Sequence, residues 1–519
     1  MKAWLITALA LAACGEDHPP PSCDAEQCAA AGQLCERDAC VDPWRYGSPV
    51  FSSCAGNARA TLESLHDKAA IYDARVMALH VHPQMPWVLD VALAPAVDPE
   101  TATSVDVAAW RSGENDGLWS ALVLAAEAYR FAVTHDAAAR AGIATLLHGE
   151  QLRMQITGVA GLMTRQLIPP SIAGLACPTD PLAYVPSADK TSNRWVAIDA
   201  GGCVETADAT GVLHATTHCG LAAFANWCFL DNISQDEYAG HVFALGAAAR
   251  LVDDPELHAL AVDLLDQIGR HLVDHDMQFV DWDGRPTQYG KLYPTAGGDT
   301  PGYLAVLGAS YVATAARGTD DRQLTTAYGD LAPGYATYLD QIQIWSGADG
   351  CTSNWNDISM LTAAFHHLLW SDAALTRQPF VDAFRRELVD PTRGILDQHN
   401  AWYEIMWAAM KPLGPTSDGP AFDAVADAAC QLREFPRSNH LVAHDTAPLA
   451  VEACTGRKGE SMAATAFEIA DRCAATYIWW GNSYVRGSCV TDPTLVQNPA
   501  GYLLPYWMGR YYGFIDPGA

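Results

Sequence analysis

Carboxylates and aromatic rings occur together at points where apolar helical segments are expected to begin. Asp357 lies two residues after Trp355, and Glu404 lies two residues after Trp402. A carboxylic acid can protonate a leaving oxygen while a second carboxylate activates a water molecule. Aromatic rings beside them can stack on the faces of sugar rings. These residue types in this pattern therefore indicate chemistry on a glycosidic bond.

We predict that Asp236 and Glu404 are the acid and base of such a pair. Ser234 can already cap the helix that follows it, so the Asp236 carboxylate is not needed for capping. Glu404 lies about one turn inside an otherwise apolar and aromatic segment, where an unpaired carboxylate is costly. A functional role would explain both residues.

Four further candidate catalytic residues also have structural explanations. Asp116 and Asp357 lie where a side chain could cap a helix. Ser234-x-x-Glu237 fits a capping box, in which Glu237 accepts a hydrogen bond from the backbone amide of Ser234. His241 follows Glu237 by four residues on the same helical face, and it is either a proton carrier or a buried structural histidine.

Aromatic residues at the same helix starts form the predicted substrate platform. A polysaccharide lyase would instead need a tyrosine or histidine base and a positive group for a uronate, and Tyr238 and His241 could act as the base. Helix amino ends gathered in one place would favour an anionic ligand. The predicted substrate-binding residues are Trp119, Tyr238, Trp355, Trp402 and Tyr403.

No metal or cofactor is predicted from the sequence. The pairs His214/His218 and His440/His444 have one-turn spacing that could hold a metal if helical, but both lack a clear third ligand. The segment from Asp281 to Gly284 resembles part of a calcium loop, yet a tight turn explains it better. Nucleophile elbows, phosphate loops and dinucleotide fingerprints are absent from the sequence.

Two kinds of helical segment alternate along the chain, six of each. One kind is charged on one side, at about 57–80, 136–157, 255–275, 321–345, 376–389 and 418–434. The other is apolar nearly all round, at about 117–133, 235–251, 301–316, 355–370, 400–410 and 500–514. A helix without a polar face must be surrounded by protein. We therefore predict an all-α chain, with an (α/α)6 toroid of six helical hairpins over residues 51–519; the alternative is an irregular helical bundle.

The connections between these segments differ in length. Links from an apolar segment to the next charged one are short, whereas the reverse links are often long, as at 158–234 and 435–499. In a toroid these two sets lie on opposite faces. The long, cysteine-bearing loops would then share one face with the starts of the apolar helices, which is where binding sites are expected.

The amino-terminal residues predict export. An apolar run ends in Leu11-Ala12-Ala13-Cys14, which matches a lipobox, so residues 1–13 would be a signal peptide and Cys14 the lipidated residue. An ordinary secretory signal is the alternative. The chain would be anchored outside the cytoplasm, in the outer membrane, through this lipid alone.

Cysteine usage agrees with an oxidising compartment. The chain has 15 cysteines, and the 14 that remain after Cys14 could form up to seven disulfides. Four of them cluster in the predicted tether and Cys-rich segment, residues 14–50, and would form a small two-disulfide knot: Cys23, Cys28, Cys35 and Cys40.

The charge balance excludes some partners. The chain has 31 basic and 60 acidic residues, a net charge of −29, which disfavours binding to nucleic acid or to anionic lipid. Half of the residues are apolar, so a large core is expected rather than disorder.

The alternating pattern, with acids at the starts of the apolar helices, resembles the six-hairpin glycosidase superfamily. That superfamily includes glycoside hydrolases and the toroid domains of polysaccharide lyases. The resemblance covers about 55–519 and is one of architecture, because no full motif of any single family is present. Asp116, Asp236 and Glu404 match the kind of position that such enzymes use. It implies an enzyme acting on a polysaccharide or oligosaccharide, although fold likeness is a weak guide to activity.

Three functional hypotheses follow. The first is a surface-attached carbohydrate-active enzyme, a glycoside hydrolase with Asp236 and Glu404 as acid and base. The second is a non-catalytic surface lipoprotein that binds glycan or protein through the same face. The third is a toroid that acts on lipids or peptides, which would have an apolar cavity without an aromatic shelf.

Overall fold

The computed structural model divides the chain into two units, Met1–Trp44 and Arg45–Ala519. The residues described are 34–36, 39–41, 64–111, 113, 115–172, 174–177, 193–207, 212–296, 300–346, 351–371, 377–388, 394–410, 424–440, 445–472, 483–487, 492 and 494–519. In the first unit they form a hairpin of β1 (Leu34–Glu36) and β2 (Ala39–Val41). The predicted signal peptide, Cys14 and most of the Cys-rich segment lie outside the described residues.

Twelve helices of the second unit follow the two predicted sets. The apolar set is α3 (Asp116–Thr134), α5 (Gln235–Leu251), α7 (Pro301–Thr319), α9 (Trp355–Ser371), α11 (Ala401–Met410) and α13 (Ala500–Tyr511). The amphipathic set is α2 (Leu65–Leu79), α4 (Ala137–Gln155), α6 (Pro255–Asp274), α8 (Arg322–Ala336), α10 (Arg377–Leu388) and α12 (Ala424–Glu434). The predicted helix positions are confirmed within the described residues, and the predicted starts at 57–63 and 418–423 lie outside them. The largest difference is an earlier end of α8, which contains Pro333.

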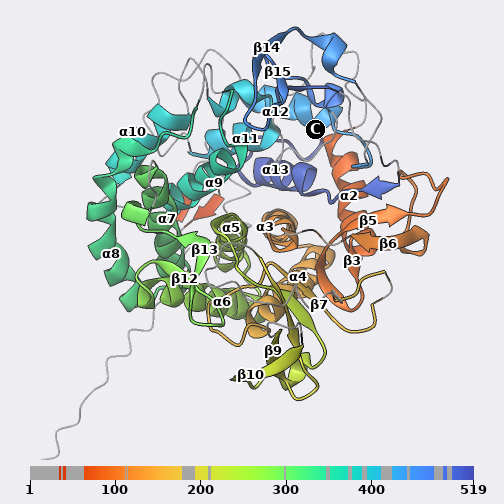
Figure 1. Ribbon diagram of the computed structural model, residues 1–519. Helices are drawn as coiled ribbons and strands as arrows, with labels where there is room; N and C mark the ends of the chain where they lie inside the picture. The colour runs from red at the N-terminus through yellow and green to blue at the C-terminus, as the bar shows by residue number, and fades with distance from the viewer. Residues whose placement is uncertain are drawn as a thin grey trace, which may run out of the picture. The chain divides into compact units, whose positions relative to one another are not determined.

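The apolar helices contact one another in a closed order. Each of α3, α5, α7, α9, α11 and α13 packs against the next, and α13 packs back against α3. Each also packs against an amphipathic partner, α4, α6, α8, α10, α12 or α2. We call the two sets the inner and outer helices. In Figure 1 the inner helices lie around the centre of this unit, with the outer helices outside them.

The chain is mostly helical but it is not all-α, because short strands fill the long loops. The link between α4 and α5 carries a five-stranded antiparallel sheet in the order β10-β9-β8-β11-β7. Its strands are β7 (Gln166–Ile168), β8 (Trp195–Ile198), β9 (Cys203–Ala207), β10 (Leu213–Cys219) and β11 (Cys228–Leu230). The disulfides Cys177–Cys228 and Cys203–Cys219 lie in the same link.

Smaller sheets join other loops. Strands β3 (Val81–His82) and β4 (Met85–Val88) form one hairpin, and β12 (Gln278–Val280) and β13 (Pro286–Lys291) form another. Strand β5 (Asp90–Leu93) lies between β6 (Val107–Arg111) and β17 (Leu495–Val496). Strand β15 (Ser461–Ala463) lies between β14 (Glu452–Thr455) and β16 (Val485–Arg486). A third disulfide, Cys351–Cys454, joins the segment before α9 to β14.

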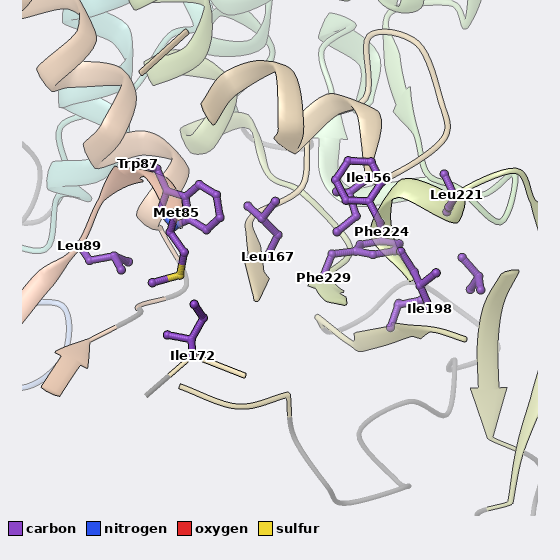
Figure 2. Close-up of a cluster of buried hydrophobic side chains, with 12 residues drawn as sticks. Met85, Trp87, Leu89, Ile156, Leu167, Ile172, Ile198, Leu221, Phe224 and Phe229 are labelled. Atoms are coloured by element: carbon purple, nitrogen blue, oxygen red, sulfur yellow. The ribbon is translucent and has the colours of Figure 1, made fainter. Parts of the chain in front are cut away.

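The sheet between α4 and α5 has an apolar core of its own. Phe229 on β11 is fully buried and packs in one cluster with Trp87 from β4, Ile156 after α4, and Leu167 on β7 (Figure 2). Burying aromatic and branched side chains on one face of a short sheet stabilises its position. This cluster therefore holds the start of β7, where Arg165 and Gln166 lie.

Among the described residues, no helix is long and apolar enough to cross a membrane.

Candidate functional site

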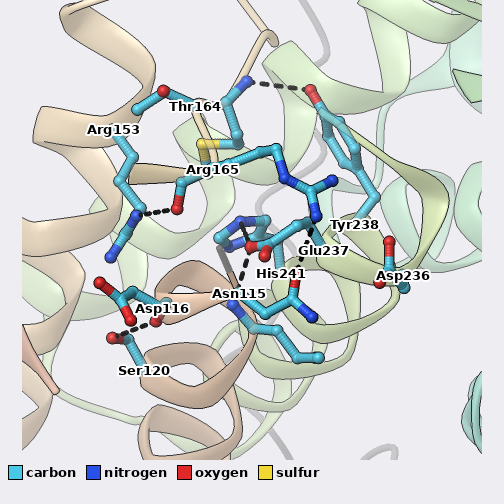
Figure 3. Close-up of polar contacts among 12 residues, drawn as sticks. Asn115, Asp116, Ser120, Arg153, Thr164, Arg165, Asp236, Glu237, Tyr238 and His241 are labelled. Atoms are coloured by element: carbon cyan, nitrogen blue, oxygen red, sulfur yellow. Dashed lines mark hydrogen bonds and ion pairs between the residues drawn. The ribbon is translucent and has the colours of Figure 1, made fainter. Parts of the chain in front are cut away.

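The amino ends of neighbouring inner helices are joined by side chains. The Arg165 guanidinium donates to Ser234 Oγ, the N-cap of α5, at 2.5 Å. It also donates to Asn115 Oδ1, at the N-cap of α3, at 2.8 Å (Figure 3). Gln235 Nε2 on α5 donates to the Tyr303 hydroxyl of α7 at 3.3 Å. We call the face formed by these helix starts the mouth.

The same chain of contacts continues around the inner helices. The Tyr303 hydroxyl donates to Met360 Sδ on α9 at 3.3 Å. Ser359 on α9 and Tyr403 on α11 share a hydrogen bond of 2.8 Å between their hydroxyls. The amino-terminal parts of α3, α5, α7, α9 and α11 are therefore linked, and Asp116, Asp236, Asp357 and Glu404 lie in the first turns of α3, α5, α9 and α11.

Asp236 and Asp357 are the half-buried carboxylates of this set. Burial raises the pKa of Asp357 to about 6; the Asn354 side chain and the Arg457 charge oppose the rise, and Asp236 adds to it. Tyr303 is buried between the two helices, and both carboxylates act on its pKa, which burial raises well above its usual value. The charges of Asp236 and Asp357 therefore both act on Tyr303, whose helix α7 packs against both α5 and α9.

Glu237 lies fully buried beneath the mouth rather than in it. Its Oε2 accepts a hydrogen bond from the backbone N–H of Leu118 in α3 at 2.9 Å, and Ser234 makes no side-chain capping bond. The predicted capping box is therefore wrong, because Ser234 is engaged by Arg165 and Asp236 instead. Burial raises the pKa of Glu237 well above its usual value, while Arg165 lowers it.

His241 continues this buried network. Its Nδ1 lies 2.5 Å from Glu150 Oε2 on α4, and its Nε2 lies 3.8 Å from Glu237 Oε2. All three side chains are essentially without solvent exposure, and Figure 3 shows His241 and Glu237 below Arg165. His241 therefore links α5 to α4 through Nδ1, while its buried Nε2 has no hydrogen-bond partner among the described residues.

Asp116 is also buried and locally bonded. Its Oδ1 accepts from the backbone N–H of Gly113 at 2.8 Å, and Gln166 Nε2 lies 3.5 Å from its Oδ2. These contacts fit a carboxylate that shapes the start of α3, where it also complements the positive end of the helix dipole.

The predicted aromatic residues differ in how far they are buried. Trp119 is half-buried, whereas Tyr238, Trp402 and Tyr403 are buried. Tyr238 stacks on Phe279 with a centroid distance of 3.4 Å, and its hydroxyl donates to the carbonyl of Gly161. Tyr238 is therefore occupied as a packing residue.

Trp355 belongs to an aromatic cluster at the start of α9. Its ring centroid lies 6.0 Å from that of half-buried Trp345 and 5.8 Å from that of Tyr484. Trp345 comes from the link between α8 and α9, and Tyr484 lies just before β16. Trp355 connects this cluster to Asp357, because the two residues are two positions apart in the first turn of α9.

Glu404 lies in a different setting from Asp236. It is fully buried, and its pKa is raised well above its usual value by burial and by Asp427, with Glu468 adding to the rise and Arg472 opposing it. Its carboxylate groups with His399 and Asp427, and these three are the described residues that could hold a metal ion. The possible metal pair His214/His218 is not helical, because both residues lie on strand β10.

Several residues of this region were not identified from the sequence. Arg165 and Tyr303 lie outside any motif, and Arg457 lies at the turn between β14 and β15, remote in sequence from Asp357. Only the apolar period of α7, which places Tyr303 in its first turn, could have indicated one of them. The expected tight turn at Asp281 is confirmed: Gly284 has φ +78° and donates to the Asp281 carbonyl.

Comparisons with known proteins give one weak similarity. No family model matches the sequence, and no curated protein matches it. Among solved structures, a glycoside hydrolase family 76 mannosidase from Bacteroides thetaiotaomicron VPI-5482 aligns over 71% of this chain and 98% of its own, with 10% identity and a TM-score of 0.23. A similarity at that TM-score supports no statement about this chain.

Proposed function

We propose that this protein is a glycoside hydrolase whose second unit is an (α/α)6 toroid of the six-hairpin type. The observation that supports it most is the pair of half-buried carboxylates at neighbouring inner-helix starts, Asp236 on α5 and Asp357 on α9. The closed order of inner-helix contacts supports the toroid. Acid–base hydrolysis of a glycosidic bond requires two carboxyl groups that flank the bond, and this is the role proposed for the pair.

The two carboxyl groups have different roles in this proposal. Asp357, with a pKa of about 6, holds a proton in mildly acidic solution and donates it to the leaving oxygen. Asp236 acts as the carboxylate that activates water or attacks the sugar.

The substrate surface is proposed to lie over α9. Half-buried Trp345 packs against buried Trp355, which lies two residues before Asp357, and the positive charge of Arg457 acts on Asp357. An arginine there would suit a substrate bearing hydroxyl or acidic groups. The catalytic pair is thus proposed to be Asp236 with Asp357, rather than Asp236 with Glu404.

We also propose that the chain is exported and anchored through Cys14. The lipobox in the sequence supports this, and so do the three disulfides among the described residues, since such bonds persist in oxidising compartments.

The test is release of reducing ends from a panel of soluble polysaccharides by residues 15–519. Asp357→Asn and Asp236→Asn should each lower kcat by about 10²–10⁴-fold on the substrate that wild type cleaves. Asp253→Asn is the matched control, because its exposed carboxylate lies just after the opposite end of α5; it should leave kcat unchanged.

Two outcomes would reject the proposal. Wild-type rates in both mouth variants would remove these residues from catalysis. Glycan-array binding without turnover on the whole panel would identify a non-catalytic binder instead.

A further inference from the structure

Three metal-ligating side chains from separate segments meet beside α11. The candidate ligand atoms of His399, Glu404 and Asp427 all lie within 4.8 Å of one another. His399 precedes α11, Glu404 lies in its first turn, and Asp427 lies in the first turn of α12. The hairpin of these two helices thus gathers an imidazole nitrogen and two carboxylates in one place.

Glu404 is the least satisfied member of this group. Its side chain has no solvent exposure, and neither of its oxygens receives a hydrogen bond from a donor among the described residues. Its close polar neighbour is the Asp427 carboxylate, which can hydrogen-bond to it only if one of the two holds a proton. Two adjacent buried carboxyl groups require either that shared proton or a cation between them.

The surroundings favour a cation. Gln431 Nε2 lies 3.4 Å from Asp427 Oδ2 and 3.1 Å from Glu468 Oε2, so a third carboxylate lies next to the pair. The Gln431 Oε1 atom is buried without a hydrogen-bond partner among the described residues, and it adds a possible neutral oxygen ligand. Among the described residues, the carboxylates of Glu404, Asp427 and Glu468 outnumber the guanidinium of Arg472.

That guanidinium, on Arg472, is largely committed elsewhere. It donates to the backbone carbonyls of Gln398 and His399 at 2.8 and 2.6 Å and to that of Phe467 at 2.8 Å. These bonds hold the backbone that carries His399. None of them goes to Glu404, whose oxygens have no donor among the described residues.

We propose that His399, Glu404 and Asp427 bind a divalent transition-metal ion that fixes the start of α11. One imidazole nitrogen with carboxylate oxygens suits Zn²⁺ or Mn²⁺, whereas Ca²⁺ and Mg²⁺ prefer sites made of oxygen alone. His399 at present contacts Asp427 at 2.9 Å through Nδ1, and the ion would replace that contact. The side chains of His399 and Asp427 are 30% and 18% exposed, which gives the ion a route in.

Metal content tests this directly. Purified protein would be stripped with EDTA, incubated with Zn²⁺, Mn²⁺ or Ca²⁺, dialysed, and measured by plasma mass spectrometry and thermal unfolding. Wild type should retain about one equivalent of Zn²⁺ or Mn²⁺ with a higher Tm, and Ca²⁺ should be lost. Glu404→Gln and Asp427→Asn should weaken retention by about tenfold or more.

Two comparisons, one with Glu404→Gln and one with Asp253→Asn, keep the result interpretable. Glu404→Gln supplies an amide that can donate to Asp427, so the stripped variant should be at least as stable as stripped wild type while its Tm no longer rises with metal. Asp253→Asn removes an exposed carboxylate 3.9 Å from His135, a two-residue pair of similar type, and should bind metal as wild type does.

The proposal fails if wild type retains no transition metal and its Tm does not respond. In that case a higher Tm of metal-free Glu404→Gln would indicate a proton shared by the two carboxyl groups. It fails as well if wild type retains metal but both substitutions leave retention unchanged, because the ion would then lie elsewhere. None of these outcomes depends on glycoside hydrolase activity.

Discussion

Asp236, Glu237 and Glu404 are all acids in the first turn of an inner helix, yet their surroundings differ. Asp236 is half-buried at the mouth, Glu237 accepts a bond from another helix, and Glu404 is enclosed with Asp427. Position in the helix can be predicted from the sequence because it follows the apolar period. How deeply each acid is buried cannot be predicted in this way, because burial depends on residues such as Arg165 that come from distant loops.

Glu237 illustrates what local patterns miss. Its hydrogen-bond partner, the N–H of Leu118, lies 119 residues away, so a capping box with Ser234 is the natural local prediction. Gly117 makes the contact possible: a Cβ at this position would come 2.4 Å from Glu237 Oε2. Nothing in the spacing of either segment indicates that approach.

Glu127 on α3 provides a residue-scale prediction on stability. It is buried beside Arg130, and burial raises its pKa to about 8. A carboxyl group with a raised pKa binds its proton more tightly in the folded state, so its contribution is complete at low pH and is lost as pH rises through about 8. Unfolding free energy should therefore fall between pH 5 and 8, by up to about 1.4 kcal/mol per pH unit from this group.

Urea unfolding at several pH values checks this expectation. Glu127→Gln cannot ionise, so its free energy of unfolding should fall less steeply with pH than that of wild type. Asp73, whose pKa burial raises to about 6, acts in the same direction at lower pH and remains in the variant. Equal slopes for the two proteins would contradict the assignment.

At the scale of elements, helices were predictable and strands were not. A three- and four-residue apolar period over ten or more residues identifies a helix from sequence alone. Strands such as β7 and β11 have three residues each and are stabilised by the cluster around Phe229, whose members are spread along the chain from Met85 to Phe229. The ligands His399, Glu404 and Asp427 likewise come from three segments without a short spacing motif, so no metal site was predicted.

The hairpin of β14 and β15 is the element most closely tied to the proposed substrate surface. The disulfide Cys351–Cys454 anchors it to the segment before α9, and Arg457 at its turn acts on Asp357. A Cys351→Ser/Cys454→Ser double variant should lose stability by about 2–5 kcal/mol and raise KM several-fold, because Arg457 would be held less firmly.

A matched pair separates these two effects. Cys203→Ser/Cys219→Ser removes the disulfide between β9 and β10, at the edge of the other sheet. It should lower stability in chemical denaturation while leaving KM unchanged. A KM change of equal size in both double variants would mean that the hairpin has no specific role.

At the scale of the whole second unit, closure of the inner set explains how distant residues share one site. Packing of α13 against α3 joins the two ends of this unit, and side chains link the first turns of α3 through α11. Alternation of apolar and amphipathic segments predicted this arrangement, since six helices without a polar face need partners on all sides. The same alternation could not predict which of the carboxylates at the helix starts would be half-buried and which fully buried.

The most direct test of the account is the pH dependence of kcat/KM on the polysaccharide that wild type cleaves. Asp357 must be protonated to act as the acid, and its pKa is about 6, so kcat/KM should fall as pH rises above about 6. Asp357→Asn should remove most activity and abolish that limb. A kcat/KM of wild type that stays constant up to pH 9 would contradict the account. So would an Asp357→Asn variant that keeps full activity and still loses kcat/KM above about pH 6.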